Sequence, residues 1–248
     1  MPTALFLSPH LDDVVFSCGG LAARLADQGW RTVMATAFTA SILPATGFAL
    51  ECQLDKGLPP DLDYMQLRRE EDRRAAEILG VEPRWLDLPE APHRLYASAP
   101  ELFAEIRRDD DIWRPLAARL ETLIDELRPD QLFAPQGLGG HVDHRQMIRA
   151  VQRVAGAVPV AYYRDTPYAI RNPNAPAHVE TTPETVVPIG PALDRKIHAA
   201  CAYASQIGFQ FGGPAAVAIA LTEFAIGEGQ GDPAERFCGI FRQDGFQP

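Results

Sequence analysis

Short apolar runs that alternate with helix-like stretches constrain the fold of this chain more than any other feature. Residues 4–8 (ALFLS) and 32–40 (TVMATAFTA) predict strands, and residues 19–29 (GGLAARLADQG) predict a helix between them that ends at Gly29. A strand, a helix and a second strand in this order form a βαβ unit with parallel strands. The alternation therefore favours a parallel sheet with helices on both faces.

The same alternation continues along the chain. Helical patterns follow at residues 65–80, 113–129, 144–157 and 194–207, and strand patterns at residues 84–89, 130–136 and 158–163. With 248 residues, of which 46% are hydrophobic, the chain can bury one substantial core. We expect a single α/β domain over residues 1–248, a Rossmann-like three-layer sandwich with a mostly parallel sheet.

Three stretches do not fit this alternation. Residues 40–63 contain three prolines and two glycines and are too long for an ordinary connection, so we expect a lid-like insertion or a surface excursion that covers a neighbouring helix. Residues 165–191 are similarly rich in proline and asparagine. Residues 209–227 are apolar enough for core or for a subunit contact in a homo-oligomer, and core is the favoured interpretation.

Charge and composition exclude several classes of protein. Asp and Glu outnumber Lys and Arg by 33 to 23, which argues against a nucleic-acid partner because such sites need clustered cations. No apolar run is long enough to span a membrane, and the N-terminus lacks the charged start of a signal peptide, so we expect a cytoplasmic protein. The four cysteines lack CxxC spacing, which favours reduced thiols over a disulfide framework or a cysteine zinc site.

Polar motifs follow two of the expected strands. SPHLDDVVFSCGG contains His10 and Asp13, and LFAPQGLGGHVDH contains His141 and His144 with the same spacing. The carboxyl ends of parallel strands meet at one edge of the sheet, where ligands bind in open α/β folds. Two imidazoles and a carboxylate are a ligand set for a catalytic zinc, so the two motifs together predict a metal site.

Each motif alone has a plainer interpretation. An Asp-Asp pair at a helix start is most often a cap that accepts free backbone N–H groups. A lone histidine beside a strand is often only a hydrogen-bonded loop residue. The residues RREED within the helix expected over 65–80 are typical of a solvated helix face with ion pairs. The occurrence of two such motifs at two sheet-edge junctions favours the metal site.

Four segments resemble the PIG-L/LmbE-like family of zinc N-deacetylases. SPHLDDVVFSCGG resembles the family's His-Pro-Asp-Asp-Glu segment, and GGHVDH resembles its His-x-x-His motif. LRREEDRRAAEILG and RKIHAACAYASQ resemble two further helices of the family. Leu11 and Val14 stand where the family usually has proline and glutamate, which leaves the proposed ligand positions unchanged.

The resemblance implies a role for individual residues. One zinc ion per chain would be bound by His10, Asp13 and His144. Asp12 would be the general base, and His141, if protonated, would stabilise the developing oxyanion or protonate the leaving amine. The family also implies that Arg68 contacts the substrate.

The implied function is zinc-dependent hydrolysis of an N-acyl group, with acetyl expected, on a small amino sugar, glycoside or related conjugate. A non-heme iron enzyme uses the same type of ligands, but its usual setting is a β-rich barrel rather than alternating strands and helices. A non-catalytic sugar-binding domain would not need Asp12 beside a complete ligand set. A serine hydrolase is disfavoured because the chain has no GxSxG motif.

Overall fold

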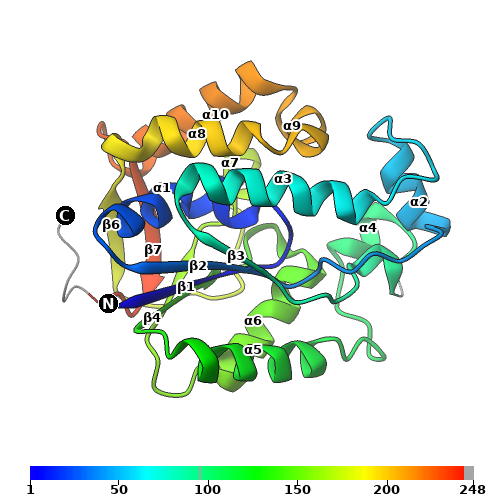
Figure 1. Ribbon diagram of the computed structural model, residues 1–248, viewed down its shortest axis with the longest axis horizontal. Helices are drawn as coiled ribbons and strands as arrows, with labels where there is room; N and C mark the ends of the chain where they lie inside the picture. The colour runs from blue at the N-terminus through cyan, green and yellow to red at the C-terminus, as the bar shows by residue number, and fades with distance from the viewer. Residues whose placement is uncertain (95, 243–248) are drawn as a thin grey trace.

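The computed structural model describes residues 1–94 and 96–242, which form a sandwich around a seven-stranded sheet (Figure 1). The strands are β1 (Thr3–Ser8), β2 (Arg31–Thr36), β3 (Glu82–Trp85), β4 (Gln131–Pro135), β5 (Val160–Tyr163), β6 (Glu184–Pro188) and β7 (Ala234–Gly239). Their order is β3-β2-β1-β4-β5-β7-β6. The first five are parallel, whereas β7 runs antiparallel to both β5 and β6. The expected mostly parallel α/β sheet is confirmed.

Helices cover both faces of the sheet, as Figure 1 shows. One face carries α1 (Asp13–Asp27), α3 (Tyr64–Leu79), α8 (Leu193–Cys201), α9 (Ala204–Phe211) and α10 (Pro214–Glu228), and the other carries α5 (Trp113–Leu127) and α6 (Val142–Val154). The short elements are α2 (Gly47–Leu54), α4 (Ala99–Leu102), α7 (Tyr168–Arg171), and the 3₁₀ turns η1 (Ala91–His93), η2 (Leu138–Gly140) and η3 (Gly190–Ala192).

The central strand β1 divides its side chains between two cores. Phe6 belongs to the core beneath α1 and stacks on Phe133 of β4 with ring centroids 4.3 Å apart. Leu5 and Leu7 point to the opposite core beneath α5 and α6. All four residues are almost completely buried. Burial on both faces explains why this strand is a continuous apolar run rather than an alternating one.

Helix α1 begins six residues earlier than the expected helix and is interrupted at Cys18 (φ −139°, ψ 24°). The N–H groups of Gly20 and Leu21, which follow the interruption, donate to the carboxylate of Glu235 at 2.9 and 2.8 Å. A Cβ atom on Gly20 would lie 2.8 Å from the side chain of Ile189. Gly20 therefore serves close packing of α1 against the antiparallel end of the sheet.

The antiparallel strands β6 and β7 were not predicted from the sequence. β6 lies inside the proline-rich stretch 165–191 and is an edge strand, where few side chains are buried and the apolar pattern is weak. β7 pairs with β5 through the register Tyr163↔Phe237. A contact between segments so far apart in sequence leaves no local signal.

The segment 40–63 is ordered and contains α2, which projects from the end of the molecule near α4 (Figure 1). The side-chain amide of Gln53 donates to the carbonyls of Pro59 and Leu62. Ile42 and Leu43 are 39% and 57% exposed. The segment thus holds its own shape while presenting apolar side chains at the surface, and its action as a lid stays a prediction.

The apolar stretch 209–227 is core on one side only. Val217, Leu221 and Ala225 of α10 are buried, whereas Phe209 and Ile219 are 63% and 60% exposed. Within the described ranges, no single helix has both the length and the apolar composition of a membrane span. Only α9 and α10 taken together, with 66° between them, reach that length and composition.

Candidate metal and catalytic site

The first motif turns sharply between β1 and α1. The backbone N–H of His10 donates to Oδ2 of Asp13 at 2.7 Å, and Nδ1 of His10 lies 3.4 Å from the same oxygen. Asp12, between them, has φ 149°, a backbone conformation that few residues with a side chain adopt. This turn sends the side chains of Asp12 and Asp13 in different directions although the residues are adjacent.

The second motif brings His144 to the same place from the first turn of α6. Its Nε2 atom lies 3.3 Å from Oδ2 of Asp13, and the side chain is completely buried. One ligand atom each from His10, Asp13 and His144 falls within a mutual distance of 4.8 Å. The expectation that the two sheet-edge motifs converge is therefore met.

The donor atoms of this cluster fit a divalent metal ion. Within the described residues, Nε2 of His144 is buried without a hydrogen-bond partner, which is costly unless a further group completes it. Burial opposes ionisation of Asp13, yet the neighbouring His144 and His10 hold the pKa of its carboxyl well below the usual range. An ionised carboxylate with two imidazoles is the donor set of a catalytic metal site with open positions.

Asp165 supports His144 and was missed in the sequence. Its Oδ1 atom lies 2.6 Å from Nδ1 of His144, and its Oδ2 atom accepts hydrogen bonds from the N–H groups of Gly137 and Leu138 at 2.7 and 3.0 Å. Metal-binding histidines commonly use such a carboxylate to fix the ring and its tautomer. The available signal was that Asp165 follows β5 at the same edge of the sheet.

Asp143 supports His10 in a similar way and was also missed. Its Oδ2 atom lies 3.0 Å from Nε2 of His10 and accepts the N–H of Ala91 at 3.0 Å, and its Oδ1 atom lies 2.7 Å from Nη2 of Arg94. Asp143 could also form a metal-binding group with His10 and His141. Because both of its oxygens already have partners, the group that contains Asp13 and His144 is the better metal site.

Asp12 lies beside the cluster in a buried position next to Arg68. Its Oδ2 atom is 3.8 Å from Nη2 of Arg68. Burial, partly offset by the charge of Arg68, raises the pKa of Asp12 to about 7. A carboxyl group with a pKa near neutrality can both accept and return a proton.

Arg68 is only 5% exposed and is held by protein groups. Its Nη1 atom lies 2.5 Å from Oε1 of Glu90, and its Nη2 atom donates to the carbonyl of Leu11 at 3.2 Å. The structure places Arg68 behind Asp12 rather than on an open surface.

The RREED stretch of α3 is not a solvated helix face, as its charge pattern had suggested. Glu71 accepts hydrogen bonds from the N–H and hydroxyl of Ser205, and it is 3% exposed. Asp72 is completely buried and accepts from Trp85 and Tyr203. The expectation was wrong because the partners come from segments far away in the sequence, which bury these carboxylates on the packed side of the helix.

His141 caps the N-terminus of α6. Its Nδ1 atom accepts the backbone N–H of Asp143 at 3.1 Å, so a neutral ring carries its proton on Nε2. Burial and the neighbouring His10 lower the pKa of His141 to about 3. The protonated form of His141 considered in the sequence analysis is therefore disfavoured.

An aromatic wall, formed by Phe103 and Tyr168, borders the histidines. The ring centroid of Phe103 lies 5.3 Å from that of His141 and 5.9 Å from that of Tyr168, and Tyr168 lies 5.5 Å from His144. Gly139 allows this packing because a Cβ atom there would lie 2.8 Å from the Tyr168 ring. Phe103 is 48% exposed, so the wall presents an apolar surface beside the site.

Comparisons with known proteins agree with this geometry. The family model of PIG-L, GlcNAc-PI de-N-acetylase, matches residues 5–155, a range that contains both motifs. A 2'-N-acetylparomamine deacetylase of Streptomyces fradiae is 33% identical over 168 residues, and the match covers 66% of this chain and 57% of the relative. A protein of the same name from Niallia circulans is 30% identical over 189 residues, with 66% of each chain covered.

Solved structures match over nearly the whole chain. A teicoplanin deacetylase in its zinc-inhibited form has a TM-score of 0.84 and 26% identity, and the match covers 98% of this chain and 99% of that one. The matches to the two curated relatives, in contrast, span less than two thirds of their lengths.

Proposed function

This chain belongs to the PIG-L family of GlcNAc-PI de-N-acetylases, and from this membership we propose that it is a zinc-dependent hydrolase that removes an N-acetyl group from an amino sugar or glycoside. The observation that carries the proposal is the buried cluster of His10, Asp13 and His144 with Asp12 beside it. The related deacetylases support an N-acetylated sugar as the class of substrate.

His10, Asp13 and His144 would hold one zinc ion per chain. Zinc bound by three protein ligands supplies a Lewis acid that polarises an amide carbonyl and lowers the pKa of water. Asp165 and Asp143 hold the two imidazoles in place from the outside. The two imidazoles are thus held by carboxylates from two separate segments of the chain.

Asp12 acts as the general base. Its carboxylate takes a proton from the attacking water and then returns it to the nitrogen of the leaving amine as the amide C–N bond breaks. Arg68 holds the Asp12 carboxylate from behind and acts as a positioning residue. A single residue can serve both proton transfers because the pKa of Asp12, about 7, lies near the working pH.

His141 stabilises the negative charge that develops on the carbonyl oxygen. Its neutral ring donates from Nε2 because Nδ1 is occupied by the N–H of Asp143. Phe103 and Tyr168 offer an apolar wall for the methyl group of the acetyl or for the apolar face of the sugar ring.

The remaining features of the chain fit the same activity. We take residues 1–248 as one catalytic domain in which residues 40–63 act as a lid that contacts the distal part of a conjugate. We assign the protein to the cytoplasm, with support from its four unpaired cysteines.

The test is acetate release by the zinc-loaded protein from N-acetylglucosamine and from a panel of N-acetylated glycosides, with metal content measured on the same sample. We expect release with several members of the panel, loss of activity with a chelator, and recovery with zinc. Absence of acetate release from the whole panel by a zinc-loaded, folded protein contradicts the proposal. Activity that requires iron and oxygen instead would indicate the oxygenase alternative.

A further inference from the structure

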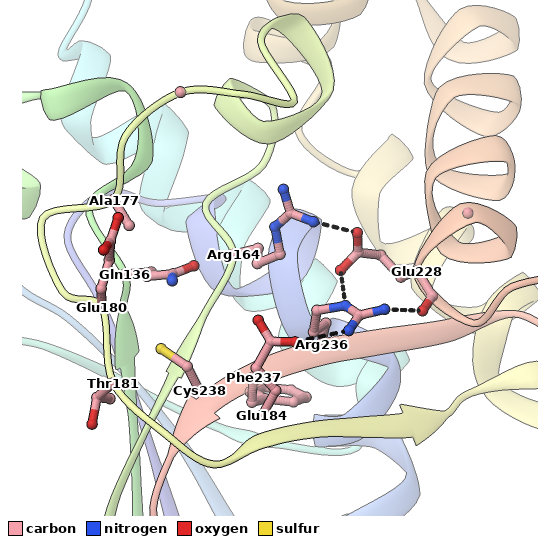
Figure 2. A pocket seen from close by; sticks show the side chains of 12 residues that line it. Gln136, Arg164, Ala177, Glu180, Thr181, Glu184, Glu228, Arg236, Phe237 and Cys238 are labelled. Atoms are coloured by element: carbon pink, nitrogen blue, oxygen red, sulfur yellow. Dashed lines mark hydrogen bonds and ion pairs between the residues drawn. The ribbon is translucent and has the colours of Figure 1, made fainter.

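A second cavity, of about 660 Å³, lies at the antiparallel end of the sheet and contains none of the metal-site residues (Figure 2). Gln136 and Arg164, which follow β4 and β5, line it together with the segment 175–184, the end of α10 and β7. Figure 2 shows Gln136 and Glu180 on the side opposite Arg164 and Glu228. The volume is that of a site for a small molecule.

Paired charges form one wall of this cavity. Nη1 of Arg164 lies 2.5 Å from Oε1 of Glu228, and Nη1 of Arg236 lies 3.0 Å from Oε2 of Glu184. Arg236 also contacts Glu228 through Nε at 3.4 Å and through a hydrogen bond from Nη2 to the Glu228 carbonyl at 2.9 Å. Both guanidinium charges are thus balanced by carboxylates of the protein.

Other polar side chains of the cavity lining lack hydrogen-bond or ion-pair partners among the described residues. Within residues 1–94 and 96–242, neither the Glu180 carboxylate nor the Gln136 side-chain amide has a hydrogen-bond or ion-pair partner, whereas Oε2 of Glu228 makes an ion pair with Nε of Arg236 at 3.4 Å but no hydrogen bond. Two arginines and three glutamates line the cavity, which leaves a surplus of negative charge. The spare groups include carboxylates that accept and an amide that both donates and accepts.

We propose that this cavity binds an amino sugar, the class of product that the proposed function releases, on which this inference rests. Hydroxyl groups of a sugar both donate and accept, so they match the spare carboxylates and the amide. An ammonium group complements the unpaired negative charge of Glu180. A phosphate or carboxylate ligand is disfavoured because the two guanidinium groups already have carboxylate partners.

The cavity is connected to the metal site through the backbone. Gln136 precedes Gly137, whose N–H donates to Asp165, and Arg164 directly precedes Asp165. Asp165 in turn contacts His144 at 2.6 Å. A bound amino sugar therefore lies against residues next to the support of His144 without filling the metal site.

Calorimetry measures the binding of glucosamine to the full chain, in its zinc-loaded form and in its metal-free form. Glu180→Gln removes the unpaired charge at an exposed position, and Glu121→Gln on α5 is the matched control. We expect wild type and the control to bind glucosamine with or without metal, and Glu180→Gln to bind at least about tenfold more weakly, because a hydrogen bond to a charged group is lost. Glucose should bind about tenfold more weakly than glucosamine to wild type.

Three outcomes would overturn the proposal: no glucosamine binding by wild type, binding that disappears with the metal, or unchanged affinity in Glu180→Gln. The measurement does not depend on turnover. Failure of the deacetylase activity would leave glucosamine binding intact, whereas failure of this inference would leave acetate release intact, so the two are distinguishable.

Discussion

Nδ1 of His144 lies 2.6 Å from Oδ1 of Asp165, and both side chains are buried. The other oxygen of Asp165 is fixed by the N–H groups of Gly137 and Leu138, so the carboxylate cannot turn away from the imidazole. This contact directs Nε2 of His144 towards Asp13. The carboxylate thus determines the orientation of a proposed metal ligand without belonging to the proposed ligand set.

Asp165→Ala is expected to weaken zinc binding by about 10- to 100-fold, because the ring of His144 loses its support. Asp165→Asn should lose less, since its amide oxygen can still accept from Nδ1–H. Competition with a chromogenic chelator gives the affinities, and Asp125→Ala on the exposed face of α5 is the control. Zinc affinity equal to wild type in a folded Asp165→Ala protein would contradict the assigned role.

Substitutions of Asp12 and of Asp13 should have different effects although the two residues are adjacent. Asp12→Asn is expected to retain zinc and to lose about 10²- to 10⁴-fold in kcat, because a general base is removed. Asp13→Asn should lose the metal itself, as should His144→Ala, because three ligands leave none to spare. Metal analysis and initial rates on the same samples check both statements. Normal turnover by both Asp variants would show that the roles are wrong.

Arg68 can act on the base or on the substrate, and the kinetic constants distinguish the two. The contact with Asp12 at 3.8 Å predicts that Arg68→Met lowers kcat about tenfold or more while KM stays within about twofold, since a general base contributes 10²- to 10⁴-fold. Arg69→Met, which removes a donor to the carbonyl of Thr39, is the neighbouring control. A raised KM with unchanged kcat would instead support the substrate contact that the family resemblance implied.

The convergence of His10, Asp13 and His144 could be predicted because it depends on local rules. His10 and His144 each follow an apolar strand, and parallel strands bring their carboxyl ends to one edge. Their supports could not be predicted in the same way. Asp165 follows the predicted strand 158–163 at the same edge, but only the pairing of β5 with β4 shows that it reaches His144.

The sequence patterns also failed to predict which charged residues are buried. Glu71 and Asp72 lie on α3 at a spacing typical of a solvated face, yet their partners Ser205 and Tyr203 come from the region of α8 and α9. Hydrophobic periodicity reports which apolar side chains face inward, but it carries no information on which carboxylates are compensated by distant donors. The edge strand β6 was missed because pairing at the edge needs little burial, and β7 was missed because its partners β5 and β6 lie far away in the sequence.

Asp72 predicts a pH dependence of stability. Burial raises its pKa to about 6 despite hydrogen bonds from Trp85 and Tyr203, so its ionisation opposes folding. This contribution to stability is fully present below the unfolded pKa, near 4, and is lost as the pH rises through about 6. The asparagine in Asp72→Asn cannot ionise, so this variant does not lose that stability as the pH rises.

The free energy of unfolding of Asp72→Asn relative to wild type should therefore rise by about 2–3 kcal/mol between pH 4 and pH 8. Denaturant unfolding across this range gives the difference, and Asp125→Asn at an exposed position should show no such trend. A difference between Asp72→Asn and wild type that does not change with pH would show that burial of Asp72 does not perturb its ionisation.

The apolar side chains of segment 40–63 offer the last test, which concerns substrate size. Ile42 and Leu43 are exposed, whereas Gln53 and its contacts hold the segment in shape, so Ile42→Ser/Leu43→Ser changes the surface without removing the fold of the segment. If these side chains cover the distal part of a conjugate, the variant should raise KM several-fold for a glycoside with a large apolar group, at about 1.5–3 kcal/mol for each fully buried side chain as an upper limit. KM for N-acetylglucosamine should not change, because that substrate has no distal part. Ile219→Ser on α10, equally exposed but distant in sequence, is the control. Equal changes in KM for both substrates, or none for either, would assign the segment to packing rather than to selection of the substrate.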